Sequence, residues 1–325
     1  MILVVGATGQ LGSAVVKRLA GEGQAVRALV RKRSDCEHLQ LSGVELATGD
    51  LREAGSLQKA LRGTRAVIAT ASVVFPRGPY DFARDEKQGY ENLIEAASEA
   101  GVERLTFISN EARTYRRIPT IRYKREIERK LRTSAVPYTI VRSAPFMDDY
   151  FALIGSDIPL RGAQAATLRR SFWFSKQFVN LTGSLVEKYG IAMVPGDAQI
   201  RHSFIALDDV AQFLIRACEA PQLCNRQISI GGPQALSWSE VAALYGRLLE
   251  RPVRALRSLP TLNALGSFAL RPFSPAASNQ MALLWLVGSF SIVVADAQGH
   301  AAALGIHLTS AEQFLTERIA DPTQH

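Results

Sequence analysis

A glycine-rich turn near the start of the chain limits the possible folds more than any other feature of the sequence. Residues 2–5 are a short apolar run, typical of a buried parallel strand, and glycines spaced G-x-x-G-x-x-G follow at once. Apolar residues then recur at helical spacing over residues 11–19, and residues 25–30 indicate a second strand. A strand, a glycine turn, a helix and a strand predict a βαβ unit whose turn binds a dinucleotide.

The turn has the residues that a pyrophosphate site needs. Glycine allows a tight turn and a close approach of the backbone, and the helix N-terminus supplies N–H groups and the positive end of its dipole. A turn that uses glycine for its conformation alone is the alternative interpretation. The cofactor-binding residues expected here are Gly6, Thr8, Gly9, Gln10, Leu11 and Gly12.

The second strand ends at a cation. NAD-selective sites usually place an acid here to bind the ribose 2′-hydroxyl, whereas this chain has Arg31, followed by Lys32 and Arg33. A guanidinium fits a 2′-phosphate because it offers several N–H donors to the phosphate oxygens. The sequence therefore predicts NADP(H) in preference to NAD(H). For Lys32 and Arg33, a solvated loop is the alternative interpretation.

Later strands end in further candidate cofactor ligands, because the carboxyl ends of parallel strands face the cofactor in a doubly wound sheet. A strand over residues 44–51 gives Asp50, expected to accept from the adenine amine, and Leu51, whose backbone can contact the ring. Asp50 could instead cap the helix that follows. Strands over residues 66–70 and 102–109 give the remaining candidates, Thr70, Ala71, Ser72 and Ser109.

Strands alternate with helices throughout the first half of the chain, with an irregular loop expected over residues 80–85. The alternation predicts an α/β fold, a doubly wound parallel Rossmann sheet with helices on both faces.

The regular alternation of strands and helices ends after the sixth predicted strand. We expect residues 1–145 to form the dinucleotide-binding domain. Residues 146–325 are expected to be a mixed segment that contributes sheet-edge strands and a smaller C-terminal substrate-binding lobe. This segment contains the aromatic run at residues 172–174, and Ser237 with Glu240 predicts a capping box at a helix start.

Composition argues against several classes of protein. The three cysteines follow no metal-ligand spacing and the five histidines are scattered, so no metal site is expected. The strand at Ile2 leaves no room for a leader peptide, and we expect a cytoplasmic protein. Residues 272–295 carry no ionised side chain, but prolines and polar residues interrupt them. A buried helix that lines a substrate pocket is therefore expected, not a transmembrane span, and a membrane-facing surface is the alternative.

Much of the net charge of +8 lies between Arg113 and Arg132. Glu126 and Glu128 are interleaved with the cations, and no pattern of aromatic residues for base stacking accompanies them. A solvated helix face that helps to attract a polyanionic cofactor is expected, and nucleic-acid binding is not.

Short motifs follow one another along the chain: GATGQLG at 6–12, GD at 49–50, NLIEAA at 92–97, KREIE at 124–128, VPYTIVR at 136–142, DDVA at 208–211 and SIGGP at 229–233. In this order they resemble the NmrA-like family of atypical short-chain dehydrogenases/reductases, over roughly residues 1–255. The family implies a Rossmann domain that binds NAD(P)H and a small lobe that closes over a substrate. Some members reduce quinones or enones, and others are redox-sensing regulators or assembly factors. The chain is also similar to a photosystem-assembly branch of plastid proteins.

The Tyr-x-x-x-Lys pair common in short-chain dehydrogenases is absent, because Thr120 stands four residues before Lys124. The resemblance implies that Lys124 is the key polar group near the nicotinamide, where it holds ribose hydroxyls or donates a proton if burial lowers its pKa. A surface cation on a basic helix is the alternative. Asp148 and Asp149 stand where the family tends to carry Asn, which we expect to place negative charge near the substrate mouth.

Two functions follow as hypotheses. In the first, the protein transfers hydride from NADPH to a small apolar quinone- or enone-like substrate, with Lys124 as the catalytic residue. In the alternative, NADP(H) occupancy of a non-catalytic module changes its affinity for a protein partner.

Overall fold

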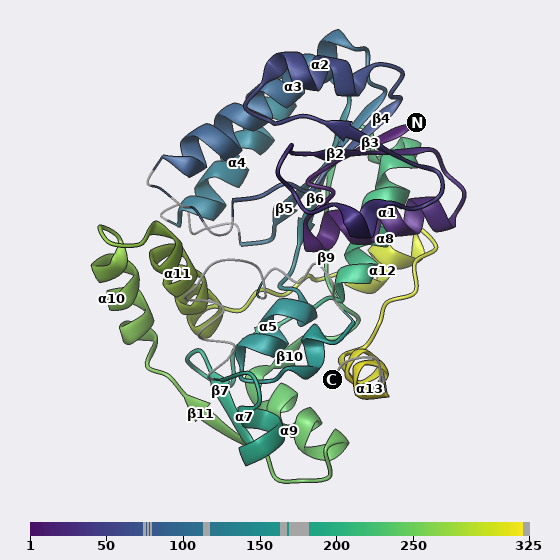
Figure 1. Ribbon diagram of the computed structural model, residues 1–325. Helices are drawn as coiled ribbons and strands as arrows, with labels where there is room; N and C mark the ends of the chain where they lie inside the picture. Colours follow the sequence, from purple (N-terminus) through teal and green to yellow (C-terminus); the bar gives the residue numbers. More distant parts are fainter. Residues whose placement is uncertain are drawn as a thin grey trace. The chain divides into compact units, whose positions relative to one another are not determined.

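The computed structural model describes residues 1–73, 76, 78, 80–112, 118–162, 168 and 182–320 (Figure 1). The basic residues at 113–117 and the aromatic run at 172–174 therefore lie outside the described residues. The chain forms two compact units. Unit 1 comprises Met1–Ser143, Asp208–Ile230 and His300–Ile306, and unit 2 comprises Ala144–Leu207, Gly231–Gly299 and His307–His325.

A seven-stranded parallel sheet is the centre of the described part of unit 1. The strand order β3-β2-β1-β4-β5-β6-β9 is that of a Rossmann fold and confirms the predicted fold class. The apolar runs of β1 and β4 are completely buried, as expected for central parallel strands. The strands are β1 (Ile2–Val5), β2 (Val26–Val30), β3 (Val44–Thr48), β4 (Ala66–Ala69), β5 (Arg104–Asn110), β6 (Tyr138–Ser143) and β9 (Arg226–Ile230).

Helices cover both faces of this sheet. Apolar side chains of α2 (Ala54–Leu61), α3 (Gly89–Glu99) and α4 (Pro119–Arg132) share one buried cluster with the sheet. On the opposite face, α8 (Leu207–Glu219) accepts a hydrogen bond from Arg104 at the carbonyl of Ala217. The helix α1 (Gln10–Gly21) lies near α8 in Figure 1.

The prediction of an irregular loop at residues 80–85 is wrong. Residues Phe82–Gln88 form a π-helical segment, η2, that continues directly into α3. A short 3₁₀ turn, η1 (Glu37–Leu39), precedes β3.

Unit 2 contains two small sheets and several helices among its described residues. Strand β8 (Arg201–His202) pairs with β10 (Leu236–Ser237), and β7 (Ile191–Val194) pairs with β11 (Arg254–Arg257). The predicted capping box is confirmed, because Ser237 and Glu240 exchange hydrogen bonds at the start of α9. The helical elements are α5 (Met147–Leu153), η3 (Ile158–Leu160), α7 (Leu185–Tyr189), α9 (Trp238–Leu248), α10 (Pro260–Leu270), α11 (Pro275–Ser289) and α13 (Ala311–Ala320).

Two short elements complete the assignment. In unit 1, η5 (Pro221–Leu223) precedes β9, and α12 (Ala297–Ala302) spans the boundary between the units at Gly299 and His300. No helix in the described part of the chain is long and apolar enough to cross a membrane.

Candidate functional site

The carboxyl ends of five neighbouring strands bring most of the predicted cofactor residues to one edge of the sheet. The strand order changes direction between β1 and β4, and ligands of doubly wound sheets bind at such a point. Gly6 follows β1 and Thr70 follows β4, and the Thr70 amide donates to the Val5 carbonyl over 2.8 Å. Arg31 and Asp50 follow β2 and β3, and Ser109 lies at the end of β5.

The glycine turn is packed so tightly that side chains would not fit. Gly6 has φ +85°, and a Cβ there would lie 2.5 Å from the Ala71 nitrogen. A Cβ on Gly12 would lie 2.1 Å from the Gly6 carbonyl oxygen. Gly9 precedes the first residue of α1, whose first turn contains no acid. The positive end of the helix dipole is therefore not offset by an acid on this turn, which suits an anion.

Three further residues of the turn differ in exposure. Leu11 is buried in the first turn of α1, and the Gln10 side chain is also largely buried. Thr8 is partly exposed.

A basic group stands where the adenosine end of a dinucleotide was predicted to bind. Arg31 is exposed at the end of β2, close enough to help lower the pKa of Asp50. The larger cause is Arg52, which donates to the Asp50 carboxylate over 2.6 Å. Asp50 also accepts from the Arg52 amide, so it closes its own turn and does not cap α2, which begins after Glu53. The Leu51 carbonyl accepts from Asn92 over 2.9 Å.

The residues after β4 are fixed by hydrogen bonds within unit 1. The Thr70 hydroxyl donates to the Val5 carbonyl over 3.0 Å. The Ala71 carbonyl accepts from Tyr90 over 2.7 Å. The Ser72 hydroxyl donates to Glu86 over 3.2 Å. These bonds hold the backbone of the segment in one conformation beside the glycine turn.

Lys124 is buried beside the end of β5. Its Nζ donates to the Ile108 carbonyl over 3.1 Å, lies 3.6 Å from the Glu86 carboxylate and is 4.8 Å from the centre of the Phe107 ring. Burial lowers the Lys124 pKa, and the Glu86 carboxylate opposes this effect. The alternative of a surface cation is therefore wrong. Tyr123, the adjacent residue, stacks on Phe82 instead.

Glu86 is a site residue that sequence analysis missed. Its side chain is almost completely buried, and its carboxylate accepts from the Ser72 hydroxyl and the Val73 amide. The residue lies inside a strongly charged stretch, Arg84–Lys87, which resembles a solvated loop in sequence. Nothing in that pattern indicates a buried partner for Lys124, because the two residues are 38 positions apart.

A second buried charge cluster corrects the prediction of a solvated helix face. The Glu128 side chain is fully buried, and it accepts from Ser109 over 2.7 Å and from Arg142 Nε over 2.9 Å. Arg125 pairs with the same carboxylate and also donates to the Ser109 hydroxyl over 3.0 Å. Burial opposes ionisation of Glu128, but these partners together hold its pKa below the usual range. The predicted ligand Ser109 thus already donates its proton within the protein.

Asp148 and Asp149 belong to α5 in unit 2. Asp148 accepts from the Leu207 amide over 2.9 Å and lies 3.4 Å from Arg318, so it ties segments of unit 2 together. Burial, aided by the charge of Asp148, raises the pKa of Asp149 to about 7.

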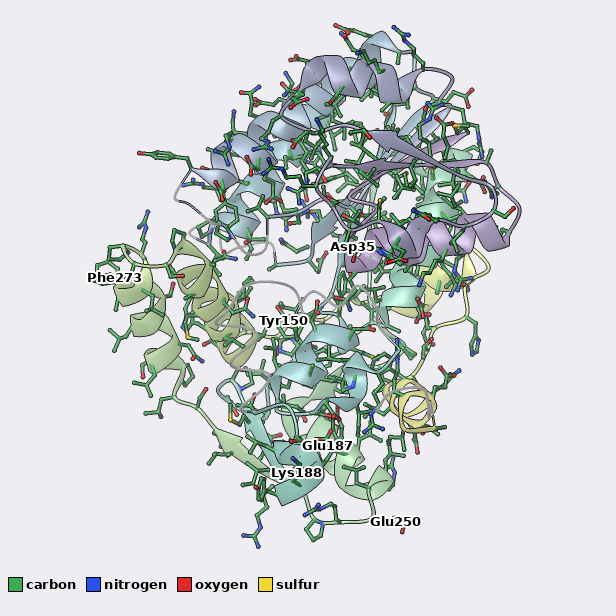
Figure 2. All side chains as sticks on the ribbon, viewed as in Figure 1. Asp35, Tyr150, Glu187, Lys188, Glu250 and Phe273 are labelled. Carbon is green, nitrogen blue, oxygen red and sulfur yellow. The ribbon has the colours of Figure 1, made fainter. Side chains whose placement is uncertain are left out.

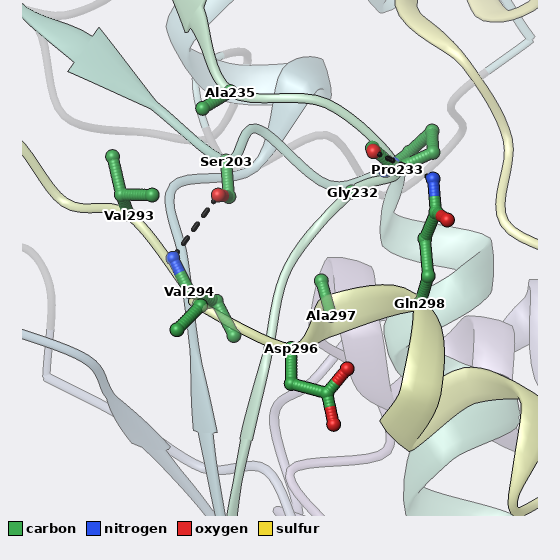
Figure 3. Close-up of a pocket in the computed structure, with 10 residues that line it drawn as sticks. Ser203, Gly232, Pro233, Ala235, Val293, Val294, Asp296, Ala297 and Gln298 are labelled. Atoms are coloured by element: carbon green, nitrogen blue, oxygen red, sulfur yellow. Dashed lines mark hydrogen bonds between the residues drawn. The ribbon is translucent and has the colours of Figure 1, made fainter.

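Unit 2 has a small pocket of its own, with a cavity volume of about 230 Å³ (Figure 3). Gly232, Pro233 and Val294 are among its lining residues, and the Val294 amide donates to the Ser203 hydroxyl over 3.1 Å. A Cβ on Gly232 would lie 1.9 Å from the Phe204 carbonyl oxygen, which explains a glycine there. None of the predicted cofactor residues lines this pocket. In the described residues, no group of His, Cys, Asp or Glu side chains could hold a metal ion.

Comparison with known proteins places this geometry in context. Residues 1–264 match the model of the NmrA-like family. The chain is 31% identical over 255 residues to an NAD(P)H azoreductase of Xenophilus azovorans, covering 78% of this chain and 76% of the relative. It is 28% identical over 248 residues to the photosystem II assembly factor Ycf39 of Guillardia theta, covering 76% and 69%. A solved NADPH-dependent quinone oxidoreductase of Escherichia coli, complexed with NADPH, superposes with a TM-score of 0.70 at 19% identity, covering 98% of this chain and 100% of that one.

Proposed function

Because the chain belongs to the NmrA-like family, we propose that unit 1 binds NADP(H) and that the protein is an NADPH-dependent reductase of an apolar quinone- or enone-like acceptor. The observation that carries the proposal is the glycine turn at the switch point of the sheet, where a Cβ on Gly6 or Gly12 would collide with the backbone that forms the turn. The azoreductase and the quinone oxidoreductase described above support a reductase.

The residues present fit a nicotinamide dinucleotide phosphate. The backbone from Gly6 to Gly12 and the N-terminus of α1 would hold the pyrophosphate, since the first turn of the helix carries no acid. Arg31 would bind the 2′-phosphate. Thr70, Ala71 and Ser72, which their hydrogen bonds fix beside the turn, would border the nicotinamide ribose. When bound, the reduced cofactor supplies hydride.

Lys124 would act at the end of β5. Its ammonium group is held by the Ile108 carbonyl and the Glu86 carboxylate, so its position is fixed before any ligand binds. Burial makes it a better proton donor than a solvated lysine, because it lowers the pKa of the ammonium group. We propose that Lys124 binds ribose hydroxyls or delivers a proton to the acceptor, the task that the absent tyrosine performs in other short-chain dehydrogenases.

Calorimetry with NADPH and NADH tests the binding half of the proposal. Arg31→Ala should weaken NADPH binding by about tenfold or more, the value of a charge-assisted contact to phosphate, and leave NADH binding unchanged. Arg33→Ala, two residues further along the same loop, is the matched control and should change neither. If neither dinucleotide binds, the whole proposal fails. If NADH binds as tightly as NADPH, the assigned role of Arg31 fails.

Oxidation of NADPH in the presence of a panel of quinones and enones tests the catalytic half. Wild-type protein should consume NADPH with at least one acceptor, and Lys124→Met should lower kcat by about a hundredfold or more, the usual contribution of a proton donor. Thermal unfolding of the variant shows whether it is folded. Full turnover by a folded Lys124→Met variant would exclude the residue from catalysis.

A non-catalytic role is the second candidate, favoured by Thr120 at the position of the usual tyrosine and by similarity to an assembly factor. In this case occupancy by NADP⁺ or NADPH would bias binding of a protein partner. The two forms must then differ in partner affinity, because a ligand shifts an equilibrium only by its differential affinity. Absence of turnover across the panel, together with intact NADPH binding, would favour this candidate.

A further inference from the structure

Unit 2 exposes a concentrated apolar surface that runs from β11 through α10 to the turn before α11, the two helices forming a hairpin. Among the described residues, six of the eleven exposed large apolar side chains lie between residues 256 and 273. Their exposed fractions range from 59% for Leu262 to 85% for Phe273, which Figure 2 labels at the turn of the hairpin. We call this set the hairpin patch; its members are Leu256, Leu259, Leu262, Leu265, Phe268 and Phe273.

The patch is held on a folded support. Gly266 of α10 approaches Met281 of α11 so closely that a Cβ would be in van der Waals contact with it. The Ser278 hydroxyl donates to the Ser267 carbonyl over 2.6 Å. The α11 side is partly buried, with Ala277 and Leu286 among its buried residues, whereas α10 has no buried residue. The buried helix predicted within residues 272–295 thus corresponds to α11, part of which is buried, and α10 lies before that stretch.

The charges around the patch are of one sign. Residues 251–295 contain four arginines and no Asp or Glu. Arg254 and Arg257 are exposed before α10, and Arg271 is exposed directly after it. Cations therefore stand at both ends of an apolar helix that carries no charge itself. Long basic side chains in this position can reach lipid phosphates while the helix stays among the upper acyl chains.

The length of α10 decides whether the helix could cross a bilayer or only lie on its surface. Eleven residues of α-helix extend about 16 Å, about half of the hydrocarbon thickness that a span must cross. From the apolar surface, its short length and its flanking arginines, we propose that the hairpin patch docks the protein on the surface of an anionic lipid bilayer. This role is separate from the proposed reductase activity, because it depends on neither the glycine turn nor Lys124.

Co-sedimentation with vesicles tests the proposal on the chain of 325 residues. We expect binding to vesicles of two parts phosphatidylcholine and one part phosphatidylglycerol, and much weaker binding to phosphatidylcholine alone. The double variant Arg257→Gln/Arg271→Gln should bind the mixed vesicles about thirtyfold more weakly, since each basic residue near an anionic surface contributes about 1 kcal/mol. The matched control Arg129→Gln/Arg226→Gln removes the same charge from exposed positions in unit 1 and should bind as wild type does.

The double variant Phe268→Ser/Phe273→Ser tests whether the apolar side chains of the hairpin patch contribute to vesicle binding. We expect this variant to lose about a hundredfold in vesicle binding, because two large apolar groups no longer enter the bilayer. Tyr189→Ser changes a similarly exposed ring on α7 and should have no effect. All these side chains are exposed, so thermal unfolding should not change.

Three results would overturn the proposal. The first is no binding to either vesicle. The second is equal loss of binding in the unit 1 arginine control. The third is a concentration-dependent dimer in sedimentation that Phe268→Ser/Phe273→Ser dissociates, which would assign the patch to a second copy of the chain.

Discussion

Replacing Glu128 by Gln should destabilise unit 1 far more than its position on a basic helix suggests. The substitution keeps the shape of the side chain and removes the negative charge that Arg125 and Arg142 share. The side chains of Arg125 and Arg142 are only 8% and 11% exposed, so water can replace little of the lost interaction. Breaking a buried ion pair by removing one partner costs about 3–5 kcal/mol, and we expect Glu128→Gln to lower the free energy of unfolding by that amount.

Urea unfolding followed by far-UV circular dichroism measures this loss. Glu126→Gln is the matched control on the same helix, because Glu126 is 25% exposed and lies 3.7 Å from Arg122. An exposed pair of this kind contributes less than about 1 kcal/mol. Unit 1 contains no tryptophan, so tryptophan fluorescence reports on the rest of the chain and should show a smaller shift if the units unfold separately.

The pH dependence gives a second measurement. The partners of Glu128 hold its pKa below the usual value of 4.5 despite its burial. Its contribution is therefore present above the pKa of the unfolded chain and is lost as pH falls through the lower pKa of the folded state. The stability difference between wild type and Glu128→Gln should shrink in acid. The reasoning is refuted if Glu128→Gln costs no more than Glu126→Gln at neutral pH.

Three further predictions concern other parts of the chain. Gly12→Ala should abolish dinucleotide binding in calorimetry, because its Cβ would lie 2.1 Å from a backbone oxygen, whereas Gly21→Ala has open space and should bind normally. Ser237→Ala should lower stability in urea by about 1 kcal/mol, because it removes the hydroxyl that accepts from the Glu240 amide; loss of less than a few tenths would contradict a capping role. Burial lowers the pKa of His202 from 6.5 to about 4. The free energy of unfolding of unit 2 should therefore be constant above pH 6.5 and fall by up to about 3 kcal/mol between pH 6.5 and pH 4. Unfolding of a His202→Asn variant, followed by fluorescence, should lack this pH dependence.

The hydrophobic pattern was sufficient to predict the Rossmann fold. Short apolar runs such as residues 2–5 and 66–69 are typical of strands buried on both faces of a parallel sheet, and the glycine turn between strand and helix has few other structural uses. The same local logic predicted the capping box at Ser237, because the residues that cap a helix are three positions apart in sequence. Pattern analysis failed at residues 80–85, where charged residues hid a helical segment.

The candidate site also contains residues that the sequence could place and a residue that it could not. Residues that directly follow strands, such as Arg31 and Asp50, could be placed at one sheet edge because parallel strands end together. Glu86 could not be predicted as a site residue, because its partner Lys124 is distant in sequence. Only the packing of the folded chain brings the Glu86 carboxylate next to the Lys124 ammonium group.

The sequence by itself determined the repeating βαβ architecture and the edge at which a dinucleotide is expected, since both depend on interactions between residues close along the chain. Only the tertiary structure decided which charges are buried and which apolar side chains are exposed. Burial depends on contacts between segments that are far apart in sequence. For this reason Glu128, in a charged helix, lies in the core, while Phe268, in an apolar helix, is exposed.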